Sequence, residues 1–290
     1  MHLTTHACAL LLLATAGSVA APSVRAAESY DSCTGFIDSL PATIATQGVW
    51  CLRKDLSTAM SSGAAITIAA NNVTIDCNGF KVGGLAGGDA STARGVLAAN
   101  RQNAAVRNCA LRGFHTGVEF TGDAGGGHLV EANRINQSLS RGIYVEGENN
   151  LVRDNRVFDT GGAPGATAAW GMGGSADFIG NIISGGFAAA ESPQYVYGIM
   201  VVSGVARDNI VRGLVKDEGA TGAATGIHVG GLASGVLIRG NSITAIEAGF
   251  SGGYGIWGIN AATSICADNL VMDYTADIGG CQDAGGNASN

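Results

Sequence analysis

The sequence predicts an all-β fold, a right-handed single-stranded parallel β-helix whose short strands stack turn upon turn. The first observation is a series of short apolar stretches that each end at an Asn or a Cys. The second is a series of glycines that each open a unit such as GVEF, GIYV, GIMV or GIHV. Two interleaved repeats at one loose period indicate a solenoid rather than a globular domain.

The residue that ends each apolar stretch, here called the corner residue, recurs every 22 to 32 positions and predicts about eight turns. The series runs Cys77, Cys109, Asn133, Asn155, Asn181, Asn209, Asn241 and Asn269. A side chain at an inner corner is buried, so its polar groups need partners, and stacked amides can bond to one another. We therefore expect an internal Asn ladder formed by Asn133, Asn155, Asn181, Asn209, Asn241 and Asn269.

One unit, residues 141–155, illustrates the strands. In RGIYVEGENNLVRDN, Ile143 and Val145 alternate with Tyr144 and Glu146, so one face is apolar and the other polar. EGENN is a turn, and LVRDN is a second short strand. Three such strands make one turn of about 22 residues, and longer turns carry an insertion in one loop, as near Leu85. A leucine-rich repeat is the alternative, but its LxxLxLxxNxL frame is absent.

Composition limits the class of partner. The chain has 290 residues and a formal net charge of −7, with 16 Lys and Arg against 23 Asp and Glu. No basic run is present, so nucleic acid is excluded as an expected partner. An anionic polysaccharide would have to find a local cluster of Arg residues against this overall charge. We expect a monomer.

The N-terminus has the features of a cleavable signal peptide over residues 1–26. An apolar core, ACALLLLATA, is followed by small residues and is too short to span a bilayer. The protein is therefore expected to be secreted or periplasmic, with no membrane span in the mature chain. Next, we expect an N-terminal cap over 27–47, the coil over 48–281 and a flexible tail over 282–290, because an open end would expose apolar interior and strand edges.

Cysteine usage supports an oxidising compartment. The chain has 7 Cys, and an even number remains after residue 26, which favours disulfides. The spacing fits two local closures and one link between corner positions on successive turns, although connectivity cannot be derived from sequence. No CxxC pair or Cys/His cluster indicates a metal site. The expected disulfide cysteines are Cys33, Cys51, Cys77, Cys109, Cys266 and Cys281.

The stretch GVWCLRKDLSTAMSSGAAITIAANNVTIDCNGFKVGG (48–84) resembles the entry turns of secreted bacterial parallel β-helix proteins of the pectate-lyase-like superfamily. The later units VRNCALRGF and RGIYVEG resemble successive repeats of the same family. This resemblance implies the fold but no single activity, since the scaffold hosts lyases, hydrolases, epimerases and adhesins. Lyase-like members hold calcium through clustered Asp residues. Because no such cluster lines up here, we expect no cofactor, with calcium as the ion to consider.

The outward column of the first sheet lies two residues after each repeat glycine. It runs Leu97, Glu119, Tyr144, Gly173, Met200, His228 and Trp257. Uronate lyases and epimerases of this superfamily need a base and a positive group beside the carboxylate. The predicted catalytic residues are Tyr144, Arg141, Glu119 and Glu146. Either Tyr144 or His115 would be the base and Arg141 the neutralising group, or Glu119 and Glu146 would be an acid/base pair.

Aromatic residues extend this column and indicate a surface for sugar rings. His228 and Trp257 fall one turn apart, and with His115 they are the predicted substrate-binding residues. The alternative is a solvated sheet face without a site. We thus expect a secreted protein that binds, and as a lyase or epimerase processes, a polysaccharide or cell-surface glycan, with a lyase favoured over a glycoside hydrolase. The alternative function is a non-catalytic structural or adhesive protein, and the sequence leaves enzymatic activity open.

Overall fold

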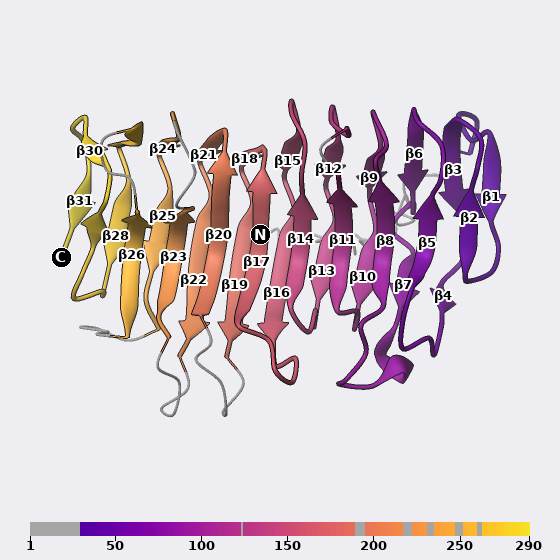
Figure 1. The fold of residues 1–290 in the computed structure, drawn as a ribbon, viewed down its shortest axis with the longest axis horizontal. Coiled ribbons are helices and arrows are strands. Elements are labelled where there is room, and N and C mark those ends of the chain that lie inside the picture. The colour runs from indigo at the N-terminus through magenta and orange to yellow at the C-terminus, as the bar shows by residue number, and fades with distance from the viewer. Residues whose placement is uncertain are drawn as a thin grey trace, which may run out of the picture.

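In the computed structural model the chain winds into a right-handed parallel β-helix. The structure describes residues 30–122, 124–188, 195–216, 222–230, 235–246, 252–259 and 263–290. Figure 1 shows the strands side by side along the longest axis, from the indigo N-terminal end to the yellow C-terminal end. The predicted signal peptide, 1–26, lies outside the described residues. No helix in the described part of the chain is long and apolar enough to cross a membrane.

Three parallel sheets form the walls of the coil, and each turn of the chain visits sheet B, then sheet A, then sheet C. Sheet A has 11 strands: β1 (Gly35–Ile37), β3 (Gly48–Leu52), β6 (Val73–Asp76), β9 (Ala105–Arg107), β12 (Leu129–Glu131), β15 (Leu151–Arg153), β18 (Asp177–Ile179), β21 (Val205–Arg207), β24 (Leu237–Arg239), β27 (Ile265–Ala267) and β30 (Gln282–Asp283).

Sheet B, which carries the candidate site, has 10 strands: β2 (Ala42–Ile44), β5 (Ala64–Ile68), β8 (Arg94–Ala99), β11 (Thr116–Thr121), β14 (Arg141–Val145), β17 (Ala168–Ser175), β20 (Tyr195–Ser203), β23 (Ala224–Val229), β26 (Gly253–Gly258) and β29 (Ile278–Gly279). Sheet C also has 10: β4 (Leu56–Ser57), β7 (Lys81–Gly83), β10 (Ala110–Arg112), β13 (Arg134–Asn136), β16 (Arg156–Gly161), β19 (Ile182–Phe187), β22 (Ile210–Val215), β25 (Ser242–Thr244), β28 (Leu270–Met272) and β31 (Ala288–Ser289).

The repeat glycines open the strands of sheet B because no side chain fits there. A Cβ added at Gly117 would lie 2.6 Å from the carbonyl oxygen of Gly142 on the next turn and 2.7 Å from Cγ2 of Ile135 in sheet C. Real Cβ atoms do not approach other atoms so closely, and interiors are packed without spare volume. The glycine series found in the sequence therefore marks the corner at which the chain passes from sheet C to sheet B.

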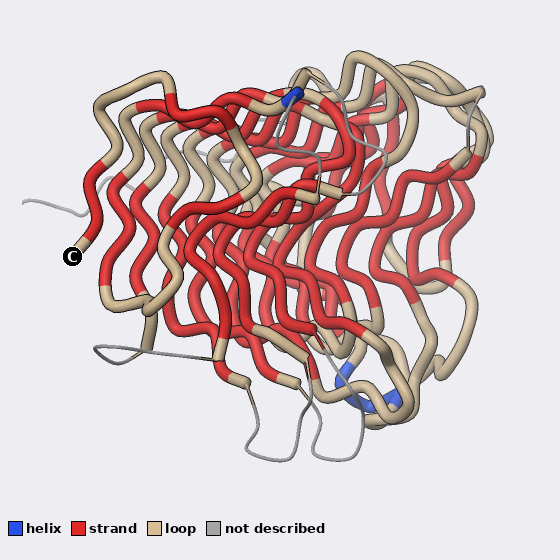
Figure 2. Tube along the Cα trace, turned by 60° about the vertical axis from the view of Figure 1, so that its left-hand side comes forward, coloured by secondary structure: helices blue, strands red, loops and turns tan. Residues whose placement is uncertain are grey.

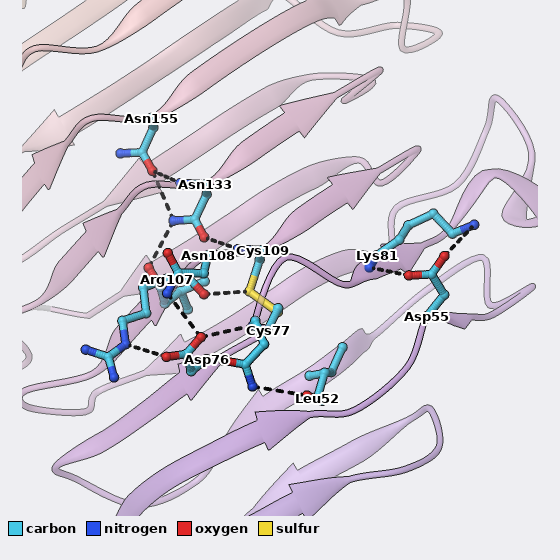
Figure 3. The surroundings of a disulfide bond; sticks show 12 residues. Leu52, Asp55, Asp76, Cys77, Lys81, Arg107, Asn108, Cys109, Asn133 and Asn155 are labelled. Carbon is cyan, nitrogen blue, oxygen red and sulfur yellow. Dashed lines mark hydrogen bonds and ion pairs between the residues drawn. A yellow bond between two sulfur atoms is a disulfide. The ribbon is translucent and has the colours of Figure 1, made fainter. Parts of the chain in front are cut away.

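The predicted Asn ladder is present, and one oxygen serves two donors on each turn. The main-chain N–H and the side-chain Nδ2 of Asn133 both donate to Oδ1 of Asn155, at 3.0 Å each (Figure 3). The second Nδ2 hydrogen of Asn133 reaches the carbonyl of Val106 on the preceding turn, at 2.9 Å. The same pattern repeats through Asn181, Asn209, Asn241 and Asn269. These amides are buried and fully used, which gives them a structural role.

The cysteines form the disulfides Cys33–Cys51, Cys77–Cys109 and Cys266–Cys281. The pair Cys77–Cys109 occupies the corner positions before the first Asn, so a covalent link replaces the amide contact at that end of the ladder (Figure 3). The main-chain N–H of Cys109 still donates to Oδ1 of Asn133 at 2.9 Å. The disulfide and the Asn ladder therefore form one continuous series of linked corner residues.

Both ends of the coil extend further than the sequence predicted. The expected cap segment contributes β1 and β2, which pair in parallel with β3 and β5 and so form a further, partial turn. The prediction of a flexible tail over 282–290 is wrong. Its strands β30 and β31 pair with β27 and β28, and Oδ1 of Asn287 accepts the amide of Asn269 at 2.9 Å. This interaction satisfies the last buried amide, which explains why the segment stays in the coil.

Several connections from sheet C to sheet B are long, and two of them flank the turns that contain β11 and β14. One, 84–93, joins β7 to β8 and contains the short 3-10 helix η1 (Leu85–Gly87). The other, 162–167, joins β16 to β17. Between them the connections into β11 and β14 are shorter, and Figures 1 and 2 show the η1 loop projecting below the sheets. Insertions on one side of the coil thus create walls around two consecutive turns.

Candidate functional site

The outer face of sheet B carries two columns of side chains. The predicted column has the predicted register, with Glu119 beside Tyr144 and His228 between Met200 and Trp257. A second column consists of the residue just before each repeat glycine. It runs Arg94, Thr116, Arg141, Trp170, Tyr197, Thr225 and Tyr254. Two buried residues separate the columns on each strand, as Gly142 and Ile143 separate Arg141 from Tyr144.

Glu119 and His228 lie in the predicted outward column, but both side chains are buried. They are only 8% and 7% exposed, because larger neighbours cover them. The Glu119 carboxylate forms an ion pair with Nε of Arg94. The His228 ring stacks under Tyr197 with ring centroids 4.7 Å apart, and burial lowers its pKa to about 4. Both side chains therefore pack beneath the outer surface of sheet B.

Tyr144 and Glu146 form a tight pair. The Tyr144 hydroxyl donates to Oε1 of Glu146 at 2.6 Å, and the main-chain N–H of Gly122 donates to Oε2 at 2.9 Å. Burial, reinforced by the bond to Glu146, raises the pKa of Tyr144 to about 12. A phenol that holds its proton so firmly is poorly suited to act as a base near neutral pH.

Arg141 packs against two aromatic rings of this face. Its guanidinium lies 4.5 Å from the centre of the Tyr144 ring and 4.6 Å from that of Trp170. No described carboxylate forms an ion pair with it, whereas Arg94 pairs with Glu119. Two aromatic faces hold the guanidinium in place and leave its N–H edges for an incoming anion.

His115 lies between the two arginines. Its main-chain N–H donates to the carbonyl of Ala93 at 2.8 Å, and its carbonyl accepts a hydrogen bond from the main-chain N–H of Arg141 at 3.1 Å. The residue lines a cavity of about 260 Å³, whose walls include Thr92 and Pro164 of the two long connections. Burial and the charges of Arg94 and Arg141 lower its pKa, so the imidazole is neutral at pH 7.

Aromatic rings continue from Arg141 along the coil axis. The Trp170 ring lies 5.6 Å from Tyr144 and 6.4 Å from Tyr197, and Tyr197 stacks on Tyr195 at 5.9 Å. On later turns Tyr254 stacks on the predicted Trp257 at 4.4 Å. These rings form a strip across several turns of sheet B.

The arginines of sheet A do not form a comparable site. Arg107, Arg153 and Arg239 each bind a carboxylate of a neighbouring turn, at 2.8, 2.6 and 2.9 Å. Their charges are therefore neutralised within the protein. Among the described residues no group of three or more His, Cys, Asp or Glu side chains is placed to hold a metal ion.

Sequence reasoning missed Arg94 and Trp170. Both immediately precede a repeat glycine, as Arg141 does, and that shared position is the signal that could have found them. Of the predicted residues, the structure brings Arg141, Tyr144, Glu146, Glu119 and His115 together on β11, β14 and their connections. His228 and Trp257 lie several turns away, on β23 and β26.

A family profile described as "Right handed beta helix region" matches residues 90–271, which is more than half of the chain. The chain belongs to this right-handed β-helix family. None of the curated proteins matches its sequence.

Several solved structures match this chain at low sequence identity. An alginate lyase from Paenibacillus sp. str. FPU-7 is 14% identical, with 86% of this chain and 95% of that chain covered and a TM-score of 0.45. A mutant tailspike protein of E. coli bacteriophage HK620 in complex with a pentasaccharide is 13% identical, with 84% and 60% covered and a TM-score of 0.45. A mutant DFA-IIIase from Arthrobacter chlorophenolicus A6 in complex with DFA-III is 12% identical, with 81% and 63% covered and a TM-score of 0.40. The chain thus spans less than two thirds of the tailspike and of the DFA-IIIase.

Proposed function

We propose that this protein binds an acidic polysaccharide along the outer face of sheet B, with Arg141 as the main ligand of a sugar carboxylate. The observation that carries the proposal is the setting of Arg141. It is a cation without an acidic partner among the described residues, and it lies between the rings of Tyr144 and Trp170. A planar guanidinium held in this way is suited to bind a carboxylate through two N–H groups.

The aromatic strip supports a saccharide rather than a small anion. Trp170 and Tyr197 offer ring faces beside Arg141, and the C–H face of a sugar ring is apolar. Strands of sheet B are spaced by roughly 4.8 Å, so successive rings can contact successive units of an extended chain. The ligand would then run along the coil axis, across several turns.

His115 supplies the group that a β-elimination needs. Neutral at pH 7, its imidazole can remove the proton at C5 of a bound uronate while Arg141 stabilises the charge that develops on the carboxylate. The electrons of the C–H bond form the C4–C5 double bond, the C4–O4 bond breaks, and the leaving oxygen takes up a proton. The products are a shortened chain and an unsaturated uronate.

Binding without turnover is the second candidate, and one observation favours it. Glu119, Tyr144 and Glu146 are all engaged inside the protein, by Arg94, by each other and by Gly122. Among the described residues of this patch, Arg141 forms no ion pair, and the His115 ring contacts Oγ1 of Thr116 at 3.4 Å. A rigid coil with this surface would serve as an adhesive or structural protein.

The test measures binding and turnover together. Wild type, Arg141→Ala and the control Arg153→Ala are titrated calorimetrically with oligouronates, and each mixture is followed by the ultraviolet absorbance of the unsaturated product. Arg153 is the matched control because it is an exposed arginine on sheet A, paired with Glu131. Binding by wild type and the control that weakens at least about tenfold in Arg141→Ala supports the proposal. Equal affinity in all three proteins contradicts it, and binding without absorbance change selects the second candidate.

We further propose that the protein is exported. Its disulfides persist in oxidising compartments, and the N-terminal apolar stretch has the length of a signal peptide. Mass spectrometry of the protein expressed in a bacterium should find the mature N-terminus near residue 27, together with oxidised cysteines. Recovery of the intact, reduced chain from the cytosol would contradict export.

A further inference from the structure

A second cavity lies beside the His115 cavity, on the sheet C side. Its volume is about 430 Å³, and its walls combine parts of the two connections, 84–93 and 162–167, with residues of sheet C and of the shorter connections between them. Asp89 lines both cavities, so the two adjoin. The volume falls within the range of small-molecule sites. We call it the turn cavity and define it by Leu85, Asp89, Gln137, Leu139, Asp159 and Phe187.

Two exposed apolar side chains, Leu85 and Phe187, line the turn cavity. Phe187 is 40% exposed and Leu85 is 51% exposed, so both side chains present apolar surface at this cavity. Each lies over a glycine that leaves it room. A Cβ on Gly162 would come within 2.8 Å of Cε2 of Phe187, and one on Gly113 within 2.6 Å of Cδ2 of Leu85. The ring and the leucine are thus seated in place and face the open space.

The polar groups of the turn cavity are mainly hydrogen-bond acceptors. Among the described residues, neither Asp89 nor Asp159 has an ion-pair or hydrogen-bond partner for its side chain. Oε1 of Gln137 accepts a hydrogen bond from Nε of Arg112 at 2.7 Å, which leaves the amide Nε2 as a donor. None of the described residues that line the cavity carries a positive charge.

This combination selects a ligand that differs from the one proposed for Arg141. Two free carboxylates beside apolar walls accept hydrogen bonds from hydroxyl or ammonium groups, while they repel a carboxylate or a sulfate. The Phe187 ring offers a face for the C–H side of a sugar ring. A sugar unit without a negative charge, either neutral or amino-substituted, meets all three requirements.

We infer that the turn cavity is a second saccharide site, and that the ligand is a heteropolysaccharide in which uronate units accompany neutral or amino sugars. This inference rests on the proposed function, since it takes the acidic unit to be held at Arg141. The shared wall at Asp89 allows one chain to pass from sheet B over the His115 cavity and place a non-acidic unit or branch in the turn cavity.

The experiment compares two probes on the full-length mature protein. One probe is an oligomer of uronate alone, and the other is an oligomer of uronate and hexosamine of equal length. The variants are Phe187→Ala and Asp159→Asn, with Asp154→Asn as the matched control. Asp154 and Asp159 both have a positive φ, 56° and 51°, which Asn tolerates well, so each substitution removes a charge without straining the turn.

We expect wild type and the control to bind the mixed oligomer more tightly than the uronate oligomer. Phe187→Ala and Asp159→Asn should weaken binding of the mixed oligomer at least about fivefold. Both variants should bind the uronate oligomer as tightly as wild type does. Equal affinity for both probes, or wild-type affinity in both cavity variants, overturns the inference. If the uronate oligomer alone binds and depends on Arg141, the inference fails while the proposed function stands. If neither probe binds wild type, both fail.

Discussion

Oδ1 of Asn181 accepts two hydrogen bonds from Asn155, one from the main-chain N–H at 3.0 Å and one from Nδ2 at 3.1 Å. The remaining Nδ2 hydrogen of Asn155 reaches the carbonyl of Val130 at 2.8 Å. Each corner amide therefore ties three consecutive turns of the coil together. Side chains on sheet B keep their register because the turns beneath them are joined in this way.

Asn155→Leu should lower the free energy of unfolding by about 1–3 kcal/mol. The change removes the acceptor of two Asn133 donors and leaves them buried without a partner. Chemical denaturation measures the effect. Arg156→Leu is the control, because it introduces the same side chain at the next, exposed position of the chain. Equal stability of the two variants would show that the ladder contributes nothing beyond packing.

Replacing Cys77 and Cys109 by Ser should destabilise the protein by about 2–4 kcal/mol. The link closes a long loop, with a sequence separation of 32, and so restricts the unfolded chain strongly. The pair Cys266–Cys281 has a separation of 15, and its removal should cost less. Thermal melts of the two double variants give the order. A larger loss from the C-terminal pair would contradict this account.

Stability should fall as the pH drops from about 6.5 to about 4, in part because of His228. Burial lowers the pKa of His228 from 6.5 to about 4, so in this window the unfolded chain binds a proton that the folded chain does not. The stability that the neutral ring contributes is present above pH 6.5 and is lost on acidification. Between about pH 7 and about pH 4.5, the melting temperature of His228→Phe should fall less than that of wild type. Parallel curves for the two proteins would rule out this contribution.

Tyr144→Phe should leave any elimination rate within about threefold of wild type, whereas His115→Gln should lower it at least about 100-fold. The reason is that Tyr144 keeps its proton, with a pKa of about 12, while His115 is neutral and lies between Arg94 and Arg141. The rate of unsaturated uronate formation measures both. Loss of the rate in Tyr144→Phe with retention in His115→Gln would reverse the assignment.

The repeat made the coil predictable from the sequence. An Asn such as Asn155 has one environment, repeated on every turn, so its spacing revealed the ladder, and the repeat glycines revealed the register of sheet B. Asn287 was missed because it follows Asn269 by only 18 positions and no apolar stretch precedes it. Local spacing carries no information about an irregular last turn.

The site was only partly predictable, because burial and partner choice arise between turns. His228 occupies the predicted column, yet Tyr197 from the preceding turn covers it. Glu119 is engaged by Arg94, whose column was not recognised. The turn cavity is lined by residues as far apart in the chain as Leu85 and Phe187, which meet only in the coil. No pattern within one repeat could indicate these contacts.

The most direct test of the central claim is a crystal structure of the protein soaked with a uronate-containing oligosaccharide. The account predicts a sugar carboxylate bound to the guanidinium of Arg141, with the next ring against Trp170 and the chain running along sheet B. An oligosaccharide bound instead on the outer face of sheet A or sheet C, with Arg141 left free, would contradict it.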